Sequence, residues 1–150
     1  MAGQSAASPL IRAMDRADLA RIVEIDTKVL GKTRPGYYEM KLEQAQKHSR
    51  AASLVAELDG QVVGFVFGGA SRWEYGVPEN VGWIDTLGVD PDFQRHGVAK
   101  ALFGEMARSL KQVGVDSIYT FVNRLDWKLL KFFDRLGFKN GDMAGLKLEL

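Results

Sequence analysis

The sequence predicts one α+β (mixed α/β) domain, in which a mixed sheet carries helices on both faces. Strand-like and helix-like segments alternate along the chain in the order βααβββαβαββ, as judged from the spacing of apolar residues. The length of 150 residues suits a single hydrophobic core. Residues 1–9 are expected to form a flexible tail, and residues 10–150 the domain.

The first elements are predicted to be a strand and two helices. Leu10–Met14 has the character of a short strand, and a helix follows until Gly31, with Asp15 or Asp18 as its N-cap. After a turn with two basic residues, residues 37–49 have the mixed charges of a surface helix.

Three strands are expected next. Ser53–Leu58 and Gln61–Gly69 are joined by Asp59-Gly60, a dipeptide that supplies the positive φ angles of a tight hairpin. These two runs should therefore pair antiparallel. The third run, Val81–Val89, stops at Asp90-Pro91 because proline cannot donate to a sheet ladder.

The last third of the chain completes the predicted order with a helix, a strand, a helix and a short hairpin: Val98–Val113, Ser117–Val122, Leu125–Leu136 and Phe138–Leu150. Asp126 is a candidate N-cap for the second of these helices. Gly137 fits the left-handed position that ends a helix, with an apolar residue after it.

The composition excludes several classes of function. A net charge of +1, from 20 basic and 19 acidic residues, provides no general field for nucleic acid or anionic membrane. The chain has no cysteine and two histidines, so neither a disulfide framework nor a metal site is expected. It has neither a signal peptide pattern nor an apolar run of about 20 residues. A cytoplasmic protein that binds neither nucleic acid nor membrane is expected.

The turn between the third strand run and the next helix is the predicted ligand site. The first amides of a helix lack intrahelical partners and can bind phosphate oxygens, and small residues let a ligand approach them. Charged side chains would surround such a diphosphate cradle. Its residues are Gln94, Arg95, His96, Gly97, Val98, Ala99 and Lys100. The alternative is an ordinary turn with solvated basic residues; the fingerprints of nucleoside triphosphate and dinucleotide sites are absent.

The run LGVDPDFQRHGVAKALF, followed by FFDRLGF, resembles the GNAT superfamily of acyl-CoA-dependent N-acyltransferases. The signature of that family is Q/R-x-x-G-x-G/A after a strand, and the close match covers Trp83–Phe138. The resemblance implies a mostly antiparallel, splayed mixed sheet of about six or seven strands, with about four helices. It also implies acetyl-CoA as co-substrate and no metal.

The resemblance assigns roles to several segments. The backbone of Leu87, Gly88 and Val89 would pair with the pantetheine arm, while residues 94–100 would hold the pyrophosphate. The acceptor amine would enter along a wall formed by residues 31–38, residues 71–80 and the terminal hairpin. Candidate acceptor-binding residues there are Arg34, Tyr37, Tyr38, Trp73 and Tyr75, unless they are ordinary surface residues.

Two further candidates for cofactor binding depart from the family pattern. Phe133 stands where many members have a tyrosine, so it cannot protonate the departing thiolate; it would pack on the pantetheine or in the core. Asp126 stands where members often have an asparagine that contacts the cofactor, and its alternative role is the N-cap.

Asp85 is the candidate general base. Strict alternation along the strand places it on one face with Trp83, Leu87 and Val89, where burial would make it a better base for an ammonium acceptor, through water. The alternative is a carboxylate whose charge is satisfied by hydrogen bonds from a neighbouring loop.

The resulting prediction is an N-acetyltransferase that moves acetyl from acetyl-CoA to a primary amine by direct attack in a ternary complex. The acceptor is a small molecule or a protein or peptide amino group, and the enzyme is a monomer or a homodimer. The alternative is a weak or inactive acyl-CoA-binding regulatory module, and a weaker one is a structural interaction domain.

Overall fold

The computed structural model describes residues 8–48, 52–70 and 80–150. The chain divides into two compact units, the first reaching to Thr120 and the second formed by Phe121–Leu150. Each unit is described separately below.

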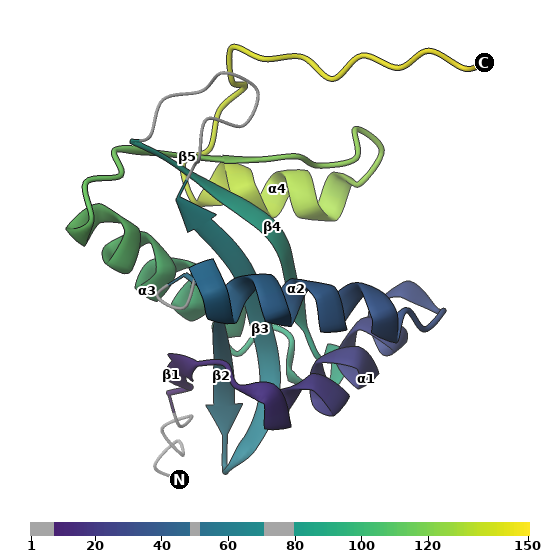
Figure 1. Cartoon of the computed structure of the whole chain (residues 1–150), viewed down its shortest axis with the longest axis vertical. Coiled ribbons are helices and arrows are strands. Elements are labelled where there is room, and N and C mark those ends of the chain that lie inside the picture. Colours follow the sequence, from purple (N-terminus) through teal and green to yellow (C-terminus); the bar gives the residue numbers. More distant parts are fainter. Residues whose placement is uncertain (1–7, 49–51, 71–79) are drawn as a thin grey trace, which may run out of the picture. The chain divides into compact units, whose positions relative to one another are not determined.

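The first unit contains a five-stranded mixed sheet (Figure 1). The strands follow the order of the sequence: β1 (Leu10–Ala13), β2 (Leu54–Leu58), β3 (Gln61–Ala70), β4 (Val81–Val89) and β5 (Ser117–Thr120). β1 to β4 pair antiparallel, and β5 joins β4 in parallel. The predicted mixed, mostly antiparallel sheet is confirmed, whereas the predicted count of six or seven strands is too high for the described chain.

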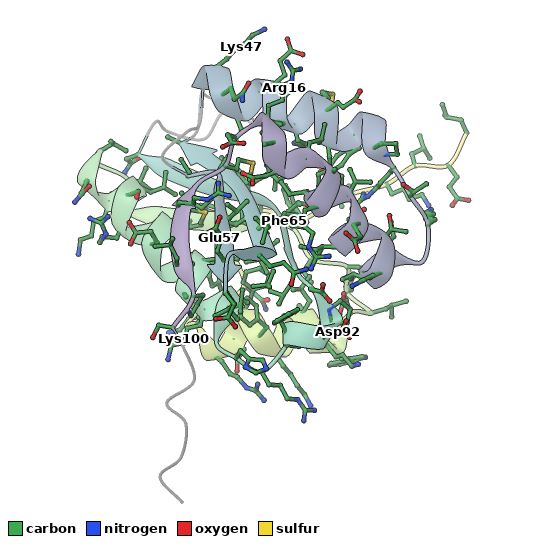
Figure 2. The ribbon with its side chains drawn as sticks, turned by 90° about the horizontal axis from the view of Figure 1, so that it is seen from below. Arg16, Lys47, Glu57, Phe65, Asp92 and Lys100 are labelled. Carbon is green, nitrogen blue, oxygen red and sulfur yellow. The ribbon has the colours of Figure 1, made fainter. Side chains whose placement is uncertain are left out.

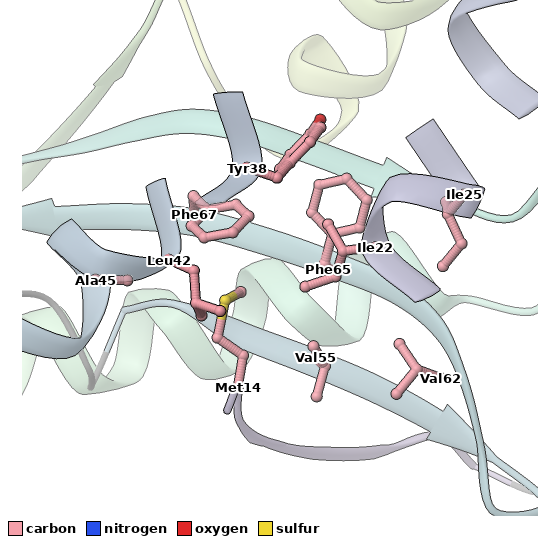
Figure 3. Packing of buried hydrophobic residues seen from close by; sticks show 10 residues of the cluster. All are labelled: Met14, Ile22, Ile25, Tyr38, Leu42, Ala45, Val55, Val62, Phe65 and Phe67. Carbon is pink, nitrogen blue, oxygen red and sulfur yellow. The ribbon is translucent and has the colours of Figure 1, made fainter. Parts of the chain in front are cut away.

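Helices cover both faces of this sheet, as predicted. On one face lie α1 (Leu19–Leu30) and α2 (Pro35–His48), which bury a cluster centred on the rings of Tyr38, Phe65 and Phe67 (Figure 3). The Phe65 side chain lies in the interior of the packed structure (Figure 2). On the other face α3 (Val98–Gln112) buries four residues at helical spacing: Val98, Leu102, Met106 and Leu110.

Glycines on β3 and β4 let α3 approach the sheet closely. A Cβ added at Gly64 would lie 2.8 Å from the Val98 side chain, and one at Gly68 would lie 2.7 Å from the sulfur of Met106. Because α3 follows the turn predicted to bind a ligand, this close packing fixes where its first amides stand relative to β4.

The predicted turns are confirmed by their backbone angles. Asp59 and Gly60 both have positive φ, 51° and 77°, as a tight two-residue hairpin requires. Gly31 ends α1 in the left-handed conformation, at φ 82°. Asp15 caps the short 3-10 helix η1 (Arg16–Asp18) that leads into α1.

The second unit is built on α4 (Trp127–Arg135). Asp126 is its N-cap, as predicted, and accepts a hydrogen bond from the Leu129 N–H at 3.0 Å. Gly137, at φ 96°, ends the helix, and the Phe138 N–H donates to the Phe133 carbonyl at 3.0 Å. The two phenylalanine rings touch, with centroids 4.9 Å apart. This is the glycine-ended helix closure that the sequence predicted.

The predicted terminal hairpin is wrong. Residues 138–150 contain no strand, although leucines alternate with charged residues at the end of this segment. An alternating pattern becomes a strand only when another strand pairs with it, and the described residues of the second unit supply none.

Candidate functional site

The turn into α3 has the backbone geometry of an anion-binding site. Arg95 and Gly97 both adopt left-handed angles, φ 70° and 73°, and right-handed helix begins at Val98. Such a change of hand directs successive N–H groups into one concavity. No side chain caps the helix, and within the described residues no acceptor binds the N–H groups of Val98, Ala99 or Lys100. Among the described contacts, the first amide of α3 with a main-chain acceptor is that of Ala101, which donates to the Gly97 carbonyl at 3.0 Å.

Gly97 is needed for its backbone angle in the free protein. The glycine was predicted to be needed for its lack of a side chain, but a Cβ added at residue 97 would meet nothing within 4 Å. Its φ of 73° is instead a conformation that L-residues adopt at a cost of about 1–2 kcal/mol.

The side chains around this turn have different roles. Gln94, Arg95, His96 and Lys100 are exposed and are free to reach a ligand (Figure 2 labels Lys100), whereas Ala99 is half-buried. Val98 is buried under β3, so only its backbone can take part. The structure therefore combines exposed cations with open main-chain amides at the predicted cradle.

One edge of β4 is open beside this turn. β5 pairs with β4 from Val81 only as far as Ile84, where the Thr120 hydroxyl donates to the Ile84 carbonyl at 3.1 Å. Beyond that point no described strand pairs with this edge. β5 ends at Thr120, so the pairing stops about halfway along β4, and the predicted splay of the two strands stays a prediction.

Leu87 and Val89 direct their main-chain groups to the open edge. The next residue, Asp90, donates its N–H to the Val63 carbonyl of β3 at 2.8 Å. Alternate residues of a strand point their N–H and C=O groups to opposite edges, so Gly88 faces β3 and its two neighbours face away. Of the three residues predicted to pair with a ligand, two have their main-chain groups available.

Asp85 does not occupy the position that strict alternation predicts. Phe67 pairs with Thr86 and Gly68 with Ile84, so Asp85 is the extra residue of a β-bulge. The bulge shifts the alternation by one residue. Leu87 and Val89 therefore lie on the α3 face, while Asp85 points to the α2 face.

The predicted burial of Asp85 is also wrong. Its side chain is 45% exposed and accepts a hydrogen bond from the Lys41 ammonium of α2 at 3.2 Å. The Lys41 ammonium also lies 5.7 Å from the centre of the Tyr37 ring. Asp85 is thus an accessible carboxylate that already holds a primary ammonium group, supplied by a helix rather than by the neighbouring loop of the alternative prediction.

A buried carboxylate that the sequence argument missed anchors the turn. Asp90 is fully buried where β4 ends, and its carboxylate binds two cations of α1: Arg21 at 2.5 Å and Lys28 at 3.1 Å. It also accepts the N–H of Asp92 at 3.0 Å, in the 3-10 helix η3 (Pro91–Phe93). The Asp-Pro pair was interpreted only as the end of a strand. The available signal was the seven-residue spacing of Arg21 and Lys28, which places both on one side of a helix.

The charge of Asp90 is stabilised by these contacts. Burial alone would raise the pKa of the Asp90 carboxyl, but hydrogen bonds from the Asp92 N–H, Lys28 and Arg21 outweigh it and lower the pKa. The Lys28 ammonium has a raised pKa, chiefly because of its hydrogen bond to Asp90. The carboxylate therefore joins α1 to the segment that leads into the cradle.

The predicted acceptor residues of the α1–α2 turn form a closed network. Arg34 binds the buried Asp26 carboxylate through two hydrogen bonds, of 2.9 and 3.0 Å, and its guanidinium lies 4.6 Å from the centre of the Tyr37 ring. Tyr38 is fully buried and donates its hydroxyl to Asp26 at 2.7 Å. Burial, then the bond to Asp26, raises the Tyr38 pKa. Tyr38 is thus a core residue of the free protein, and its contact with the acceptor stays a prediction.

The remaining predicted site residues are not assembled by the structure. Trp73 and Tyr75 lie outside the described residues. Asp126 and Phe133 belong to the second unit, where Asp126 caps α4 and Phe133 is buried against the Phe132 and Phe138 rings. Their part in cofactor binding stays a prediction.

The described residues contain neither a candidate metal site nor a candidate membrane span. No three histidine, aspartate or glutamate side chains there gather into a group that could hold a metal ion. No helix in that part of the chain has the length and apolar character needed to cross a bilayer.

Solved structures with the same fold include several acetyltransferases. AAC(6')-Iy in complex with a CoA-linked bisubstrate analog matches with a TM-score of 0.79 and 18% identity, over 96% of this chain and 99% of that one. The ribosomal-protein-S18-alanine N-acetyltransferase from Escherichia coli matches at 0.72 and 18%, over 89% and 79%. The PaiA N-acetyltransferase from Thermoplasma acidophilum, in complex with coenzyme A, matches at 0.71 and 20%, over 93% and 94%.

A family comparison covers most of the sequence. The model of the acetyltransferase (GNAT) family matches residues 18–138, which include the whole of α1, the sheet from β2 onward, the cradle and α4. The protein therefore belongs to the acetyltransferase (GNAT) family and is an acyl-CoA-dependent N-acetyltransferase.

Proposed function

We propose that the protein transfers an acetyl group from acetyl-CoA to a primary amine, by direct attack in a ternary complex. The observation that carries this proposal is the unused set of N–H groups at Val98, Ala99 and Lys100, beside an open edge of β4. Oriented amides at a helix start are suited to a diphosphate, and the free strand edge is suited to an amide-containing arm.

The residues present fit acetyl-CoA. The exposed Arg95 and Lys100 side chains add positive charge beside the amides of the cradle. Leu87 and Val89 offer main-chain groups to the pantetheine arm. When bound, acetyl-CoA supplies the acetyl thioester, whose carbonyl carbon is the electrophile. The N–H groups at the open edge of β4 would polarise that carbonyl, and holding both reactants together would supply much of the rate.

For the acceptor, we infer that an ammonium group takes the place of Lys41 at Asp85. The Asp85–Lys41 pair is a contact between a carboxylate and a primary ammonium, which is the chemistry that an amine substrate would make. Asp85 then accepts a proton from that ammonium, through water, so that the free amine can attack. A cysteine-based acyl-enzyme is excluded because the chain has no cysteine.

The similar structures support an amine acceptor without choosing its class. One is bound to an analog built on acetylneamine and another is named for alanine of a ribosomal protein. Both a small amine and the amino group of a polypeptide therefore remain acceptor classes for this chain.

The test is acetyl-CoA turnover with a panel of polyamines, aminoglycosides and peptides with free amino termini. Release of the CoA thiol can be followed with a thiol reagent without background from the protein, because the chain has no cysteine. Amine-dependent release above the hydrolysis rate, with acetylated product confirmed by mass spectrometry, supports the proposal. Tight CoA binding with no accelerated release for any amine would favour a regulatory CoA-binding module.

A further inference from the structure

The fold holds the side-chain ammonium of Lys41 where the open edge of β4 begins. This ammonium donates to the Asp85 carboxylate at 3.2 Å and lies 5.7 Å from the centre of the Tyr37 ring. Asp85 directly follows Ile84, at which the pairing of β4 with β5 ends. A primary amine of the protein itself is therefore bound at the edge that is proposed to receive the cofactor arm.

Helix packing fixes the backbone from which the Lys41 side chain extends. Leu42 and Ala45 of α2 are buried in the core cluster (Figure 3), and the Tyr38 hydroxyl donates to the Asp26 carboxylate at 2.7 Å. Lys41 follows Tyr38 by three residues and so borders the buried side of the helix. Its Cα is thus held in place, while its flexible four-carbon stem can turn.

The acetyl carbonyl of the proposed cofactor would lie close to this amine. Leu87 directs its main-chain groups to the open edge of β4, and it lies two residues after Asp85, which is about 7 Å along a strand. Rotation of the Lys41 stem is enough to carry the ammonium from the carboxylate toward that edge. Holding both reactants in one molecule gives the amine a high effective concentration.

Lys47 lies on the same helix in a different environment. Its ammonium pairs with Glu43, also of α2, at 2.8 Å, and both side chains are exposed. The carboxylate that binds Lys41 belongs instead to β4. Lys47 therefore provides an internal measure of how fast acetyl-CoA acetylates an ordinary surface lysine.

We propose that the enzyme acetylates itself, by transferring the acetyl group of bound acetyl-CoA to the Nζ of Lys41 in the same chain. This proposal rests on the proposed function, since it uses the same co-substrate and the same base. The C–N bond to Nζ forms and the C–S bond of the thioester breaks. The ammonium gives one proton to Asp85 through water and, after the attack, a second to the departing thiolate, so CoA leaves as the free thiol. The amide formed at Lys41 carries no charge and no longer pairs with Asp85 as an ammonium does.

The test is incubation of the full chain with isotope-labelled acetyl-CoA, followed by mass spectrometry of its peptides. The isotope separates new acetyl groups from any that were acquired during expression. Lys41 should be labelled at least about tenfold faster than Lys47, because a held amine reacts at a high effective concentration. Equal rates at the two lysines would indicate chemical acetylation from solution and would overturn the proposal.

Dilution tests whether the transfer takes place within one chain. At saturating acetyl-CoA, the fraction of Lys41 labelled per minute should not depend on the protein concentration. A rate that falls on dilution would show transfer between chains and would overturn the proposal. Both this measurement and the comparison with Lys47 use the wild-type protein, so neither depends on the folding of a variant.

Asp85→Asn distinguishes catalysed from chemical acetylation. The variant lacks the base, so labelling of Lys41 should fall to the rate at Lys47. Chemical acetylation should instead become faster, because the ammonium is released from its carboxylate. Unchanged or faster labelling in a variant that circular dichroism shows to be folded would overturn the proposal.

Turnover of the panel of external amines, measured on the same preparation, separates this proposal from the proposed function. Turnover of an amine with slow labelling of Lys41 would overturn self-acetylation and leave the N-acetyltransferase function in place. Rapid labelling of Lys41 without turnover of any amine would support self-acetylation and show that the panel lacks the acceptor. Neither reaction, in a protein that binds CoA, would overturn both.

Discussion

Asp90 accepts a hydrogen bond from the guanidinium of Arg21 at 2.5 Å, and this contact fastens α1 to the end of β4. Lys28 reinforces it from the next turns of the same helix. The segment held in this way leads within a few residues to the left-handed Arg95 and Gly97 and to the open amides of α3. A buried ion cluster therefore positions the turn proposed to hold the diphosphate.

Replacing Asp90 by asparagine should weaken both the fold and cofactor binding. The amide keeps an oxygen for the Asp92 N–H but leaves the cations without their countercharge, which should lower the free energy of unfolding by about 2 kcal/mol. The affinity for CoA, measured by calorimetry, should fall several-fold because the turn that leads into α3 is held less firmly.

Asp18→Asn is the matched control, since Asp18 is also buried and pairs with Arg12. It should lose similar stability with unchanged CoA affinity. Equal losses of affinity in both variants would remove the positioning role of Asp90.

Stability should fall steeply in acid because buried carboxylates are charged in the folded protein. The pKa values of Asp18, Asp26 and Asp90 are all lowered from the ordinary 3.8. Their charges therefore stabilise the fold above that value, and this stabilisation is lost as the pH falls below it through the folded-state pKa. In urea unfolding from pH 6 downward, wild type and Asp90→Asn should converge below about pH 4. A gap between them that widens in acid would contradict the assignment.

Gly97→Ala should weaken CoA binding through backbone strain. The added Cβ has open space, so the cost of about 1 kcal/mol comes from φ 73° alone. Relief of that strain moves the amides of the cradle, and the CoA dissociation constant should rise several-fold. Gly114→Ala provides the control: φ is 94°, the space around its Cβ is equally open, and Gly114 lies after the other end of α3. It should lose similar stability and keep CoA affinity; identical affinities for both variants would count against the cradle.

Asp85→Asn should lower kcat by at least tenfold while leaving the KM for acetyl-CoA unchanged, because general bases contribute about 10²–10⁴-fold.

Lys41→Met should lower the KM for a cationic acceptor several-fold, since it removes the competing ammonium. Loss of this partly exposed pair should change stability by no more than about 0.5–1 kcal/mol. Steady-state kinetics across pH 6–9 would check both variants. Wild-type kcat in Asp85→Asn throughout that range would eliminate Asp85 as the base.

Phe133→Tyr tests the departure from the family pattern. If the tyrosine hydroxyl reaches the leaving thiolate, as the resemblance implies, kcat should rise several-fold. If Phe133 only closes the end of α4, where its ring touches Phe138, the added hydroxyl would be buried without a partner. The free energy of unfolding should then fall by about 1–3 kcal/mol, and kcat should not rise. Stopped-flow release of CoA and urea unfolding, measured on the same variant, separate these results.

Most of the fold could be predicted because its signals are local. The Asp59-Gly60 hairpin, the helix ends at Gly31 and Gly137, and the Asp126 cap all depend on residues within a few positions of one another. β4 was bounded by its apolar run and the following proline. Local propensity and tertiary structure agree at these points.

The errors and omissions arise where distant residues decide the outcome. The bulge at Asp85 is a property of its pairing with β3, so alternation in one strand could not reveal it. Tyr38 is buried because the carboxylate of Asp26 receives its hydroxyl, twelve residues earlier in the chain. Asp90 depends on two cations more than sixty residues away. Charge placement in the core was therefore less predictable than backbone turns.

The most direct measurement is the ¹⁵N–¹H NMR spectrum of the protein during titration with CoA and, separately, with pantetheine. If the main-chain amides that open α3 hold the diphosphate, the resonances of Val98, Ala99 and Lys100 should shift strongly with CoA and little with pantetheine, which lacks phosphate. CoA binding that leaves these three amides unmoved, or equal shifts with both ligands, would contradict the account.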